Sequence, residues 1–192
     1  MKTLLICGCA RSGLTMTMQM LYKGGYPCIG DYPSFEGYGI GEIPFEKCNG
    51  KAIKVIDTQL QFPPSGDYHI IRLSRNIKEQ AKSQLKFLKL LGIPANRSDL
   101  NKIEKSLIND YKKIDNWAKR QNGYITLRFE EILANPENII NELIDFTDFD
   151  LNKKAMASTV IKRGPECYNG MLESEIIKNF ENEMDTKDYQ KD

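Results

Sequence analysis

A glycine-bounded loop near the start of the chain has the residue types that bind phosphate. Residues 8–13, Gly-Cys-Ala-Arg-Ser-Gly, follow a short apolar run and precede a helical pattern. Glycines at such a junction let successive backbone N–H groups turn toward one anion at the helix N-terminus. Nucleoside triphosphatases continue with Lys-Ser/Thr, whereas here Leu14 occupies the lysine position and the cation is Arg11. The pattern predicts a phosphate site without the lysine that reaches β- and γ-phosphates.

A second pair of residues with anion-binding chemistry occurs later in the chain. Arg75 follows an apolar strand pattern, and Ser83 comes eight residues after it. If Asn76 caps a helix, Ser83 lies about two turns into that helix and faces the same side as the cap. A strand-end guanidinium and a hydroxyl on that face could bind one phosphate together. This spacing is common on protein surfaces, but beside a phosphate loop it predicts a second anion site near the first.

These side chains must be positioned by a parallel sheet, because strand patterns alternate with helix patterns along the chain. The expected strands are the run before the loop and residues 51–57, 68–74 and 123–129. The expected helices follow the loop and span residues 76–91, 98–117, 135–146, 152–161 and 172–184. The alternation predicts an α/β fold of the P-loop type, with three layers and a wound parallel sheet of about four to five strands flanked by helices. Ligands bind such sheets at the carboxyl ends of the strands.

Local signals define several of these helices. Asn76-x-x-Glu79 has the form of a capping box, and Asn135-Pro136 predicts a cap followed by a first-turn proline. In the helix that begins near residue 98, apolar residues recur at three- and four-residue spacing, which predicts a face that packs in the core. That face comprises Leu100, Ile103, Leu107, Tyr111, Ile114 and Trp117.

Residues 24–50 form a long irregular stretch, rich in glycine and proline, with five aromatic residues. Loops of this length are often functional, and the aromatic content argues against plain disorder. We therefore expect a lid or acceptor-binding loop. A surface excursion with its own small hydrophobic cluster is an equally good interpretation.

The composition limits the class of protein. A chain of 192 residues predicts a single domain, residues 1–192, with a frayed tail at 185–192. Lys+Arg 27 against Asp+Glu 26 argues against nucleic acid or an anionic membrane as a partner. No stretch approaches the roughly 20 apolar residues of a membrane span. Five cysteines without paired spacing and one histidine predict reduced thiols in a cytoplasmic protein and no metal site.

Two phosphate sites without a Walker lysine suit adenosine 3′,5′-bisphosphate (PAP) better than ATP. At these residues the sequence resembles the sulfotransferases that use 3′-phosphoadenosine 5′-phosphosulfate (PAPS). Their 5′-phosphosulfate loop, (Lys/Arg)-Ser-Gly-Thr-Thr, is similar to residues 11–15, Arg-Ser-Gly-Leu-Thr. Their 3′-phosphate motif, an apolar strand ending in Arg-(Asn/Asp) with a serine eight residues after the arginine, resembles residues 70–83. The resemblance implies that the PAPS or PAP pocket is formed by Arg11, Ser12, Gly13, Leu14, Thr15, Met16, Arg75 and Ser83.

Two later stretches extend the resemblance. Residues 129–136, Phe-Glu-Glu-Ile-Leu-Ala-Asn-Pro, resemble the family pattern Tyr-Glu-Asp-Leu-x-x-x-Pro, which implies that Phe129 lies near the adenine. Residues 162–164, Lys-Arg-Gly, resemble the late basic element that closes over the 3′-phosphate, which implies roles for Arg163 and Gly164. In the phosphate loop the chain departs from the family, because Leu14 replaces a threonine and Met16 stands where many members have tryptophan.

Sulfuryl transfer needs cations for the charge that develops on the leaving phosphate and a base for the acceptor proton. Arg11 and Lys54 are the candidate cations. Cytosolic members of the family carry Lys-x-His at the end of the second strand; this chain keeps the lysine, Lys54, but has Ile56 at the histidine position.

The candidate base therefore comes from other members of the family. Several carbohydrate and tyrosyl-protein sulfotransferases use a glutamate after the first helix, which implies Glu42, with Glu36 as second choice. Asp57, at the end of the second strand, is the third choice. His69 is the only histidine, but it begins its strand at the end opposite the phosphate sites.

Three interpretations of function remain open. The first is a PAPS-dependent sulfotransferase that acts on a small-molecule or carbohydrate acceptor through a hydroxyl or amine. The second is a degenerate P-loop kinase or NTPase, with Asp57 as a magnesium-binding carboxylate. The third is a non-catalytic PAP- or nucleotide-binding module, which the missing histidine permits. The sequence indicates neither the acceptor nor the oligomeric state.

Overall fold

Four parallel strands form one sheet in the computed structural model, which describes residues 2–35, 42–121 and 123–160. They are β1 (Thr3–Gly8), β2 (Ala52–Ile56), β3 (Tyr68–Ser74) and β4 (Tyr124–Arg128), in the spatial order β2-β1-β3-β4. Every pairing is parallel. The predicted α/β fold with a wound parallel sheet is confirmed. Because all strands run the same way, the loops that follow them meet at one edge of the sheet.

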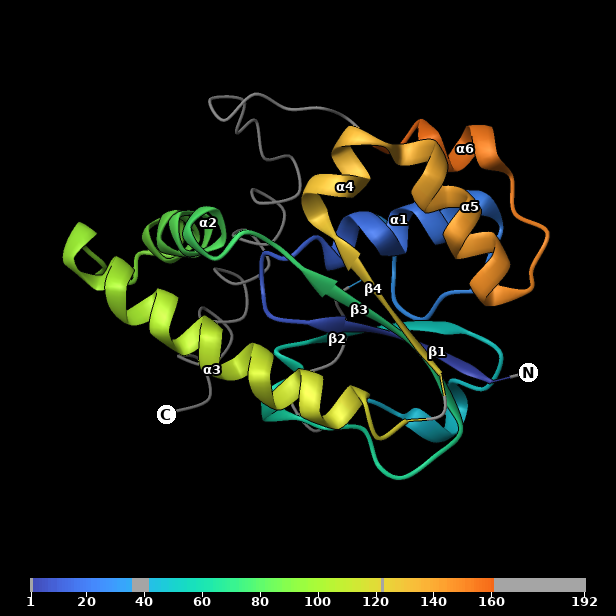
Figure 1. Ribbon diagram of the computed structural model, residues 1–192, viewed down its shortest axis with the longest axis horizontal. Coiled ribbons are helices and arrows are strands. Elements are labelled where there is room, and N and C mark those ends of the chain that lie inside the picture. The colour runs from blue at the N-terminus through green and yellow to red at the C-terminus, as the bar shows by residue number, and fades with distance from the viewer. Residues whose placement is uncertain (1, 36–41, 122, 161–192) are drawn as a thin grey trace, which may run out of the picture.

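Helices cover both faces of the sheet, which makes three layers (Figure 1). One face carries α1 (Leu14–Gly24), α5 (Pro136–Thr147) and α6 (Lys153–Ala157), and the other carries α3 (Leu100–Ala118). The short helix α4 (Phe129–Ala134) joins β4 to α5, and α2 (Ile77–Leu90) packs against α3 next to the carboxyl ends of the strands. Within the described ranges, no helix combines the length and the apolar character that a membrane crossing requires.

The side chains of β1 show how the sequence builds these layers. Leu4 and Ile6 point to the α1 face, and Leu5 and Cys7 point to the α3 face, because successive side chains of a strand alternate. All four are fully buried. A central strand of a parallel sheet is covered on both faces, so it reads as a continuous apolar run.

The α3 face is closed by the helix that the sequence predicted to pack in the core. Its residues Leu107, Tyr111, Ile114 and Trp117 are buried, which confirms that prediction. The ring of Trp117 packs 5.6 Å from the ring of Phe62.

The start of α2 differs from the predicted capping box. The side chain of Asn76 accepts hydrogen bonds from the N–H groups of Lys78 and Glu79, as expected. However, the Glu79 carboxylate binds Lys82 at 2.8 Å, and the N–H of Asn76 donates to Glu130 of α4 instead. The reciprocal half of the box was therefore predicted wrongly, because a carboxylate distant in sequence takes its place.

Other helix ends also depart from the sequence pattern. The side chain of Asn135 makes no cap hydrogen bond, although Pro136 occupies the first turn of α5 as predicted. The helix expected over residues 152–161 ends at Ala157, and α4 was not predicted at all. The predicted helix over residues 172–184 and the predicted tail lie outside the described residues.

The long stretch 24–50 packs on both sides of the sheet where it is described. Tyr26 and Phe35 belong to the cluster on the α1 face, whereas Ile43 and Cys48 belong to the cluster on the α3 face. Its buried side chains therefore join the main core, so the structure does not support the predicted separate small cluster for the described part of this stretch. Residues 36–41 lie outside the described residues.

Candidate functional site

The loop between β1 and α1 is held from behind by hydrogen bonds to Ala10. The N–H of Ala10 donates to Oδ1 of Asp57 at 2.9 Å. Its carbonyl oxygen accepts from Nε2 of Gln80 at 2.8 Å and from Nε2 of Gln84 at 3.1 Å. Two peptide groups of the loop are thereby fixed by side chains from the end of β2 and from α2.

The N-terminus of α1 is arranged to receive an anion. Gly13 precedes the helix with φ of 106°, no side chain caps the helix, and no acidic residue lies in its first turn. The N–H of Thr17 is the first that bonds back, to the carbonyl of Gly13. The N–H groups of the preceding turn have no acceptor within the helix, and the helix dipole favours negative charge there.

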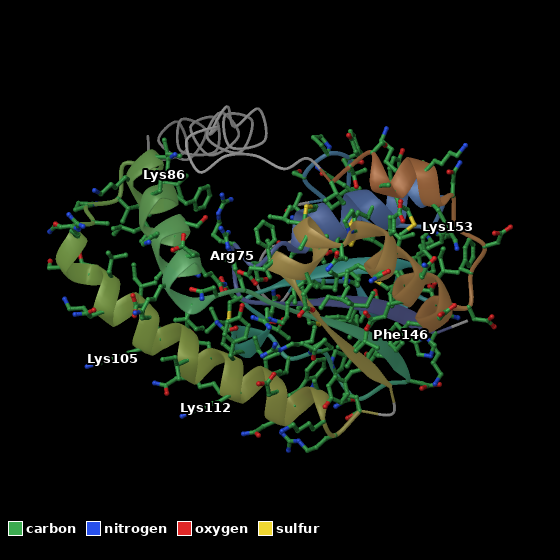
Figure 2. The ribbon with its side chains drawn as sticks, turned by 45° about the horizontal axis from the view of Figure 1, so that its top comes forward. Arg75, Lys86, Lys105, Lys112, Phe146 and Lys153 are labelled. Atoms are coloured by element: carbon green, nitrogen blue, oxygen red, sulfur yellow. The ribbon has the colours of Figure 1, made fainter. Side chains whose placement is uncertain are left out.

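Arg11 joins the two predicted anion sites. Its Nε donates to Oγ of Ser83 at 3.1 Å, and its carbonyl accepts from Nη1 of Arg75 at 3.1 Å. The Arg75 guanidinium lies 4.4 Å from the centre of the Phe129 ring, and the Arg11 guanidinium lies 5.3 Å from that of Phe87. Figure 2 shows Arg75 between α2 and α4. The structure therefore brings together residues from the ends of β1, β3 and β4 and from α2.

Lys54 of β2 contacts the first turn of α1. It is buried, with 7% of its surface exposed. Its Nζ donates to Oγ1 of Thr15 at 3.3 Å and to the carbonyl of Ser34. Two cations, Arg11 and Lys54, thus adjoin the same helix N-terminus, where negative charge is also favoured by the backbone.

Three predicted pocket residues contribute to the structure in different ways. Leu14 is buried in the cluster on the α1 face, which explains an apolar side chain at this position of the loop. The hydroxyl of Ser12 is buried. The backbone N–H of Ser12 donates to the carbonyl of Cys9 at 3.3 Å. Met16 is partly buried against the same cluster as Leu14. Their part in ligand binding stays a prediction.

The candidate bases are spread over several places. Glu42 is exposed, and the next residue, Ile43, is buried on the α3 face. Lys54 alternates with Ile53 and Val55, which are on the α3 face, so its side chain points to the α1 face. The role of Glu42 as base stays a prediction. Glu36, Arg163 and Gly164 lie outside the described residues.

Asp57 and His69 have pKa values that burial shifts. Burial raises the pKa of the Asp57 carboxyl, and its hydrogen bond from the N–H of Ala10 opposes that shift. Burial lowers the pKa of His69, and the nearby Lys2 adds to the effect. His69 pairs with Leu4 near the amino end of the sheet, so it lies far from the phosphate loop at the carboxyl end. The centre of its ring is 5.2 Å from the centre of the Phe146 ring.

Sequence patterns did not identify Gln80, Gln84 and Phe87 as part of the site. Gln80 and Phe87 lie three and four residues from Ser83 on α2, and Gln84 lies four residues after Gln80, so one broad face of the helix carries them all. An amide-rich helix face beside a predicted anion ligand is the signal that was available. The Ser34 carbonyl had no signal, because any residue carries one.

A separate surface depression of about 570 Å³ lies beside β4 and α5. It is lined by Ile125, Asn138, Asn141, Glu142, Asp145 and Phe146, and none of the predicted site residues is among these. In the described part of the chain, no group of three or more His, Cys, Asp or Glu side chains is arranged to hold a metal ion.

Comparison with solved structures finds proteins of the same fold. A retinol dehydratase in complex with androsterone and the inactive cofactor PAP aligns with a TM-score of 0.55 at 15% identity, over 82% of this chain. The mouse sulfotransferase SULT7A1 complexed with PAP aligns with a TM-score of 0.56 at 13% identity, over 83% of this chain. This chain spans 62% of the length of each.

The sulfotransferase domain from the curacin biosynthetic pathway aligns with a TM-score of 0.57 at 10% identity, over 90% of this chain and 82% of that domain. No protein-family model matches the sequence. A search of curated proteins finds no match. At these identities the likeness is one of fold: the chain has the three-layer α/β fold of these sulfotransferases.

Proposed function

We propose that this chain is a sulfotransferase that transfers a sulfuryl group from PAPS to a hydroxyl or amine acceptor. The observation that carries the proposal is the contact of Arg11 with both Ser83 and the Arg75 side chain. These contacts support a continuous anion-binding surface composed of the phosphate loop and a second cationic site. A nucleotide with phosphates at both the 5′ and 3′ positions matches that surface.

The residues of the site fit such a nucleotide by their chemistry. The uncapped N–H groups at the start of α1 would bind the 5′-phosphate, and Arg75 with Ser83 would bind the 3′-phosphate. The Phe129 ring offers an apolar face for the adenine. Arg163 and Gly164 are proposed to contribute to the 3′-phosphate site.

The transfer itself needs charge stabilisation and proton removal. PAPS supplies an activated sulfuryl group on a phosphate leaving group. Arg11 and Lys54 are proposed to stabilise the negative charge that develops on this phosphate, and Glu42 to accept the proton of the acceptor. A small molecule or a carbohydrate is the proposed acceptor.

A thermal-shift series tests the proposal. We expect PAP to raise the melting temperature without Mg²⁺, in accordance with RT ln(1 + [L]/Kd), and ATP with Mg²⁺ to have little effect. In Arg75→Ala the stabilisation by PAP should fall to that by adenosine 5′-monophosphate, because the 3′-phosphate loses its guanidinium. Arg120→Ala, two residues beyond the end of α3, is the matched control and should behave as the wild type.

Other outcomes would favour the other interpretations. Stabilisation only by ATP with Mg²⁺ would contradict the proposal and favour a kinase or NTPase. That interpretation relied on Asp57 as a magnesium ligand, whereas Asp57 accepts a hydrogen bond from the loop itself. Binding of PAP without sulfuryl transfer from PAPS to a panel of sugars, phenols and amines would favour a non-catalytic binding module.

A further inference from the structure

A chain of hydrogen bonds connects α3 to the back of the phosphate loop through α2. The hydroxyl of Tyr111 donates to Oε1 of Gln80 at 2.7 Å, and Nε2 of Gln80 donates to the carbonyl of Ala10 at 2.8 Å. Gln80 is fully buried, and 6% of Tyr111 is exposed. Buried polar side chains are costly unless satisfied, so this chain has a structural reason to be complete.

The Ala10 carbonyl determines which way the Gln80 amide faces, and the hydroxyl of Tyr111 holds the other end of that amide. With Oε1 toward Tyr111, the amide NH₂ faces the Ala10 carbonyl and both contacts are favourable. The reverse orientation would bring Oε1 against the carbonyl oxygen of Ala10, and two acceptors would repel each other. Gln84 adds a second NH₂ donor to the same carbonyl at 3.1 Å.

This carbonyl controls the next part of the loop. The C=O of Ala10 and the N–H of Arg11 belong to one planar trans peptide and point in opposite directions, so that fixing one fixes the other. Arg11 has φ of 67°, in the left-handed region that residues other than glycine rarely adopt. Such a conformation persists only where the surroundings hold it.

Tyr111 is itself held in place by β3 and α3. The Arg72 guanidinium lies 4.7 Å from the centre of the Tyr111 ring, and its Nη2 binds Oδ1 of Asp115 at 2.7 Å. Burial raises the pKa of the Tyr111 phenol, so its hydroxyl stays protonated, and able to donate, beyond the pH at which an exposed tyrosine ionises.

We propose that Tyr111 and Gln80, together with Gln84, are positioning residues of the phosphate loop. Through the Ala10 carbonyl they hold the Ala10–Arg11 peptide, and with it the left-handed turn at Arg11, in the orientation that binds the 5′-phosphate. The inference rests on the proposed function for the identity of the ligand. It assigns to α3, which packs on the face of the sheet opposite α1, a role in recognising one of the two phosphates.

Isothermal titration with two nucleotides tests this role. For Tyr111→Phe we expect PAP to bind about tenfold more weakly, since one hydrogen bond near a charged group is lost, and adenosine 3′-monophosphate to bind within about twofold of the wild type. The partly exposed Gln84→Ala should weaken PAP binding several-fold in the same selective way. Ser106→Ala removes a hydroxyl from an exposed turn of α3 and should change neither affinity.

If Tyr111 has a merely structural role, Tyr111→Phe should weaken the binding of both nucleotides equally, and that result would overturn the inference. An unchanged PAP affinity in both Tyr111→Phe and Gln84→Ala would overturn it too. If Tyr111→Phe does not fold, Gln84→Ala alone decides by the same criterion.

A wild-type chain that binds no PAP would contradict the proposed function, and inorganic phosphate then tests the loop. Phosphate-induced NMR shifts of the Arg11 and Gly13 amides that disappear in Tyr111→Phe would support the inference. Shifts that are equal in both proteins, or absent from the wild type, would overturn it.

Discussion

Gly13 illustrates how closely single residues define the site. Its φ of 106° is unfavourable for other residues, and an added Cβ would lie 2.7 Å from Cδ2 of Phe129. The two restrictions are independent, since the first concerns the backbone and the second the neighbouring ring. The ring of Phe129 can therefore touch the loop only because residue 13 has no side chain.

Gly13→Ala should reduce the free energy of unfolding by about 2–4 kcal/mol, because left-handed strain and the contact with Phe129 add. Urea unfolding measures the loss. Gly25→Ala is a matched control, since Gly25 has φ of 97° but no atom within 4 Å of an added Cβ. We expect the control to lose only about 1–2 kcal/mol, from the backbone alone. Equal losses in the two variants would show that the Phe129 contact does not matter.

Glu42→Gln tests the proposed base. The variant should bind PAP as the wild type does and transfer sulfuryl about 10²–10⁴-fold more slowly, because the amide cannot accept the proton. Glu46→Gln changes an exposed carboxylate four residues away and should keep full activity. Full activity of Glu42→Gln would move the role of base to Glu36 or Asp57, whose amide variants would be measured next.

At the residue level the sequence indicated which side chains belong to the site better than it indicated how they contact one another. Arg11, Ser83 and Arg75 were expected from two separate motifs, yet the hydrogen bond from Arg11 to Ser83 spans 72 positions of the chain. Motif spacing describes local geometry, whereas this contact depends on how β1 and β3 pair. Tyr111 was expected only to pack, because the spacing of apolar residues along the helix predicts that its ring is buried but does not predict a partner for its hydroxyl.

Among the elements, α2 has the greatest influence on the site. Its face with Gln80, Ser83, Gln84 and Phe87 contacts the loop, and its first turn is capped by Asn76. The cap fixes where α2 begins, and α2 in turn positions Ser83 and the side-chain amides of Gln80 and Gln84.

Asn76→Ala should destabilise the protein by about 1 kcal/mol, because two N–H groups lose their acceptor. The midpoint of urea unfolding provides the measurement. Asn76→Ser keeps a capping oxygen and should retain most of the stability. If serine is as destabilising as alanine, the cap is not what stabilises this end of α2.

The element boundaries could be predicted where a local pattern defines them. The apolar run of β3 defined residues 68–74 correctly, and Asn76 marked the start of α2. The six-residue helix α4 was not predicted because its residues continue directly from a strand and no side chain caps it. The carboxylate of Glu130 replaced that of Glu79 at the α2 cap because tertiary structure provided a competing partner.

For the whole molecule, the buried thiol of Cys7 and the partly buried thiol of Cys28 make stability decrease at alkaline pH. Burial raises the pKa of Cys7 and of Cys28 from 9.0 to about 12. Between these values the unfolded chain loses the thiol protons while the native chain keeps them. Stability is therefore full below about pH 9 and decreases as the pH rises.

We expect each such thiol to remove about 1.4 kcal/mol of unfolding free energy per pH unit in that window. Urea unfolding at pH 8, 9, 10 and 11 measures the slope. In Cys28→Ala the slope should be smaller by the share of one thiol, even though the variant starts from a lower stability. An unchanged slope would mean that Cys28 ionises equally in both states.

The contact between Trp117 and Phe62 has a practical consequence. Trp117 is the only tryptophan of the chain, and it packs on the α3 face, six residues beyond Tyr111 along the helix. Its fluorescence emission therefore reports on the packing of the sheet against α3 and not on the nucleotide loop. Folding of the hydrophobic layer can thus be followed optically, without a label, while ligand binding at the loop is measured by other means.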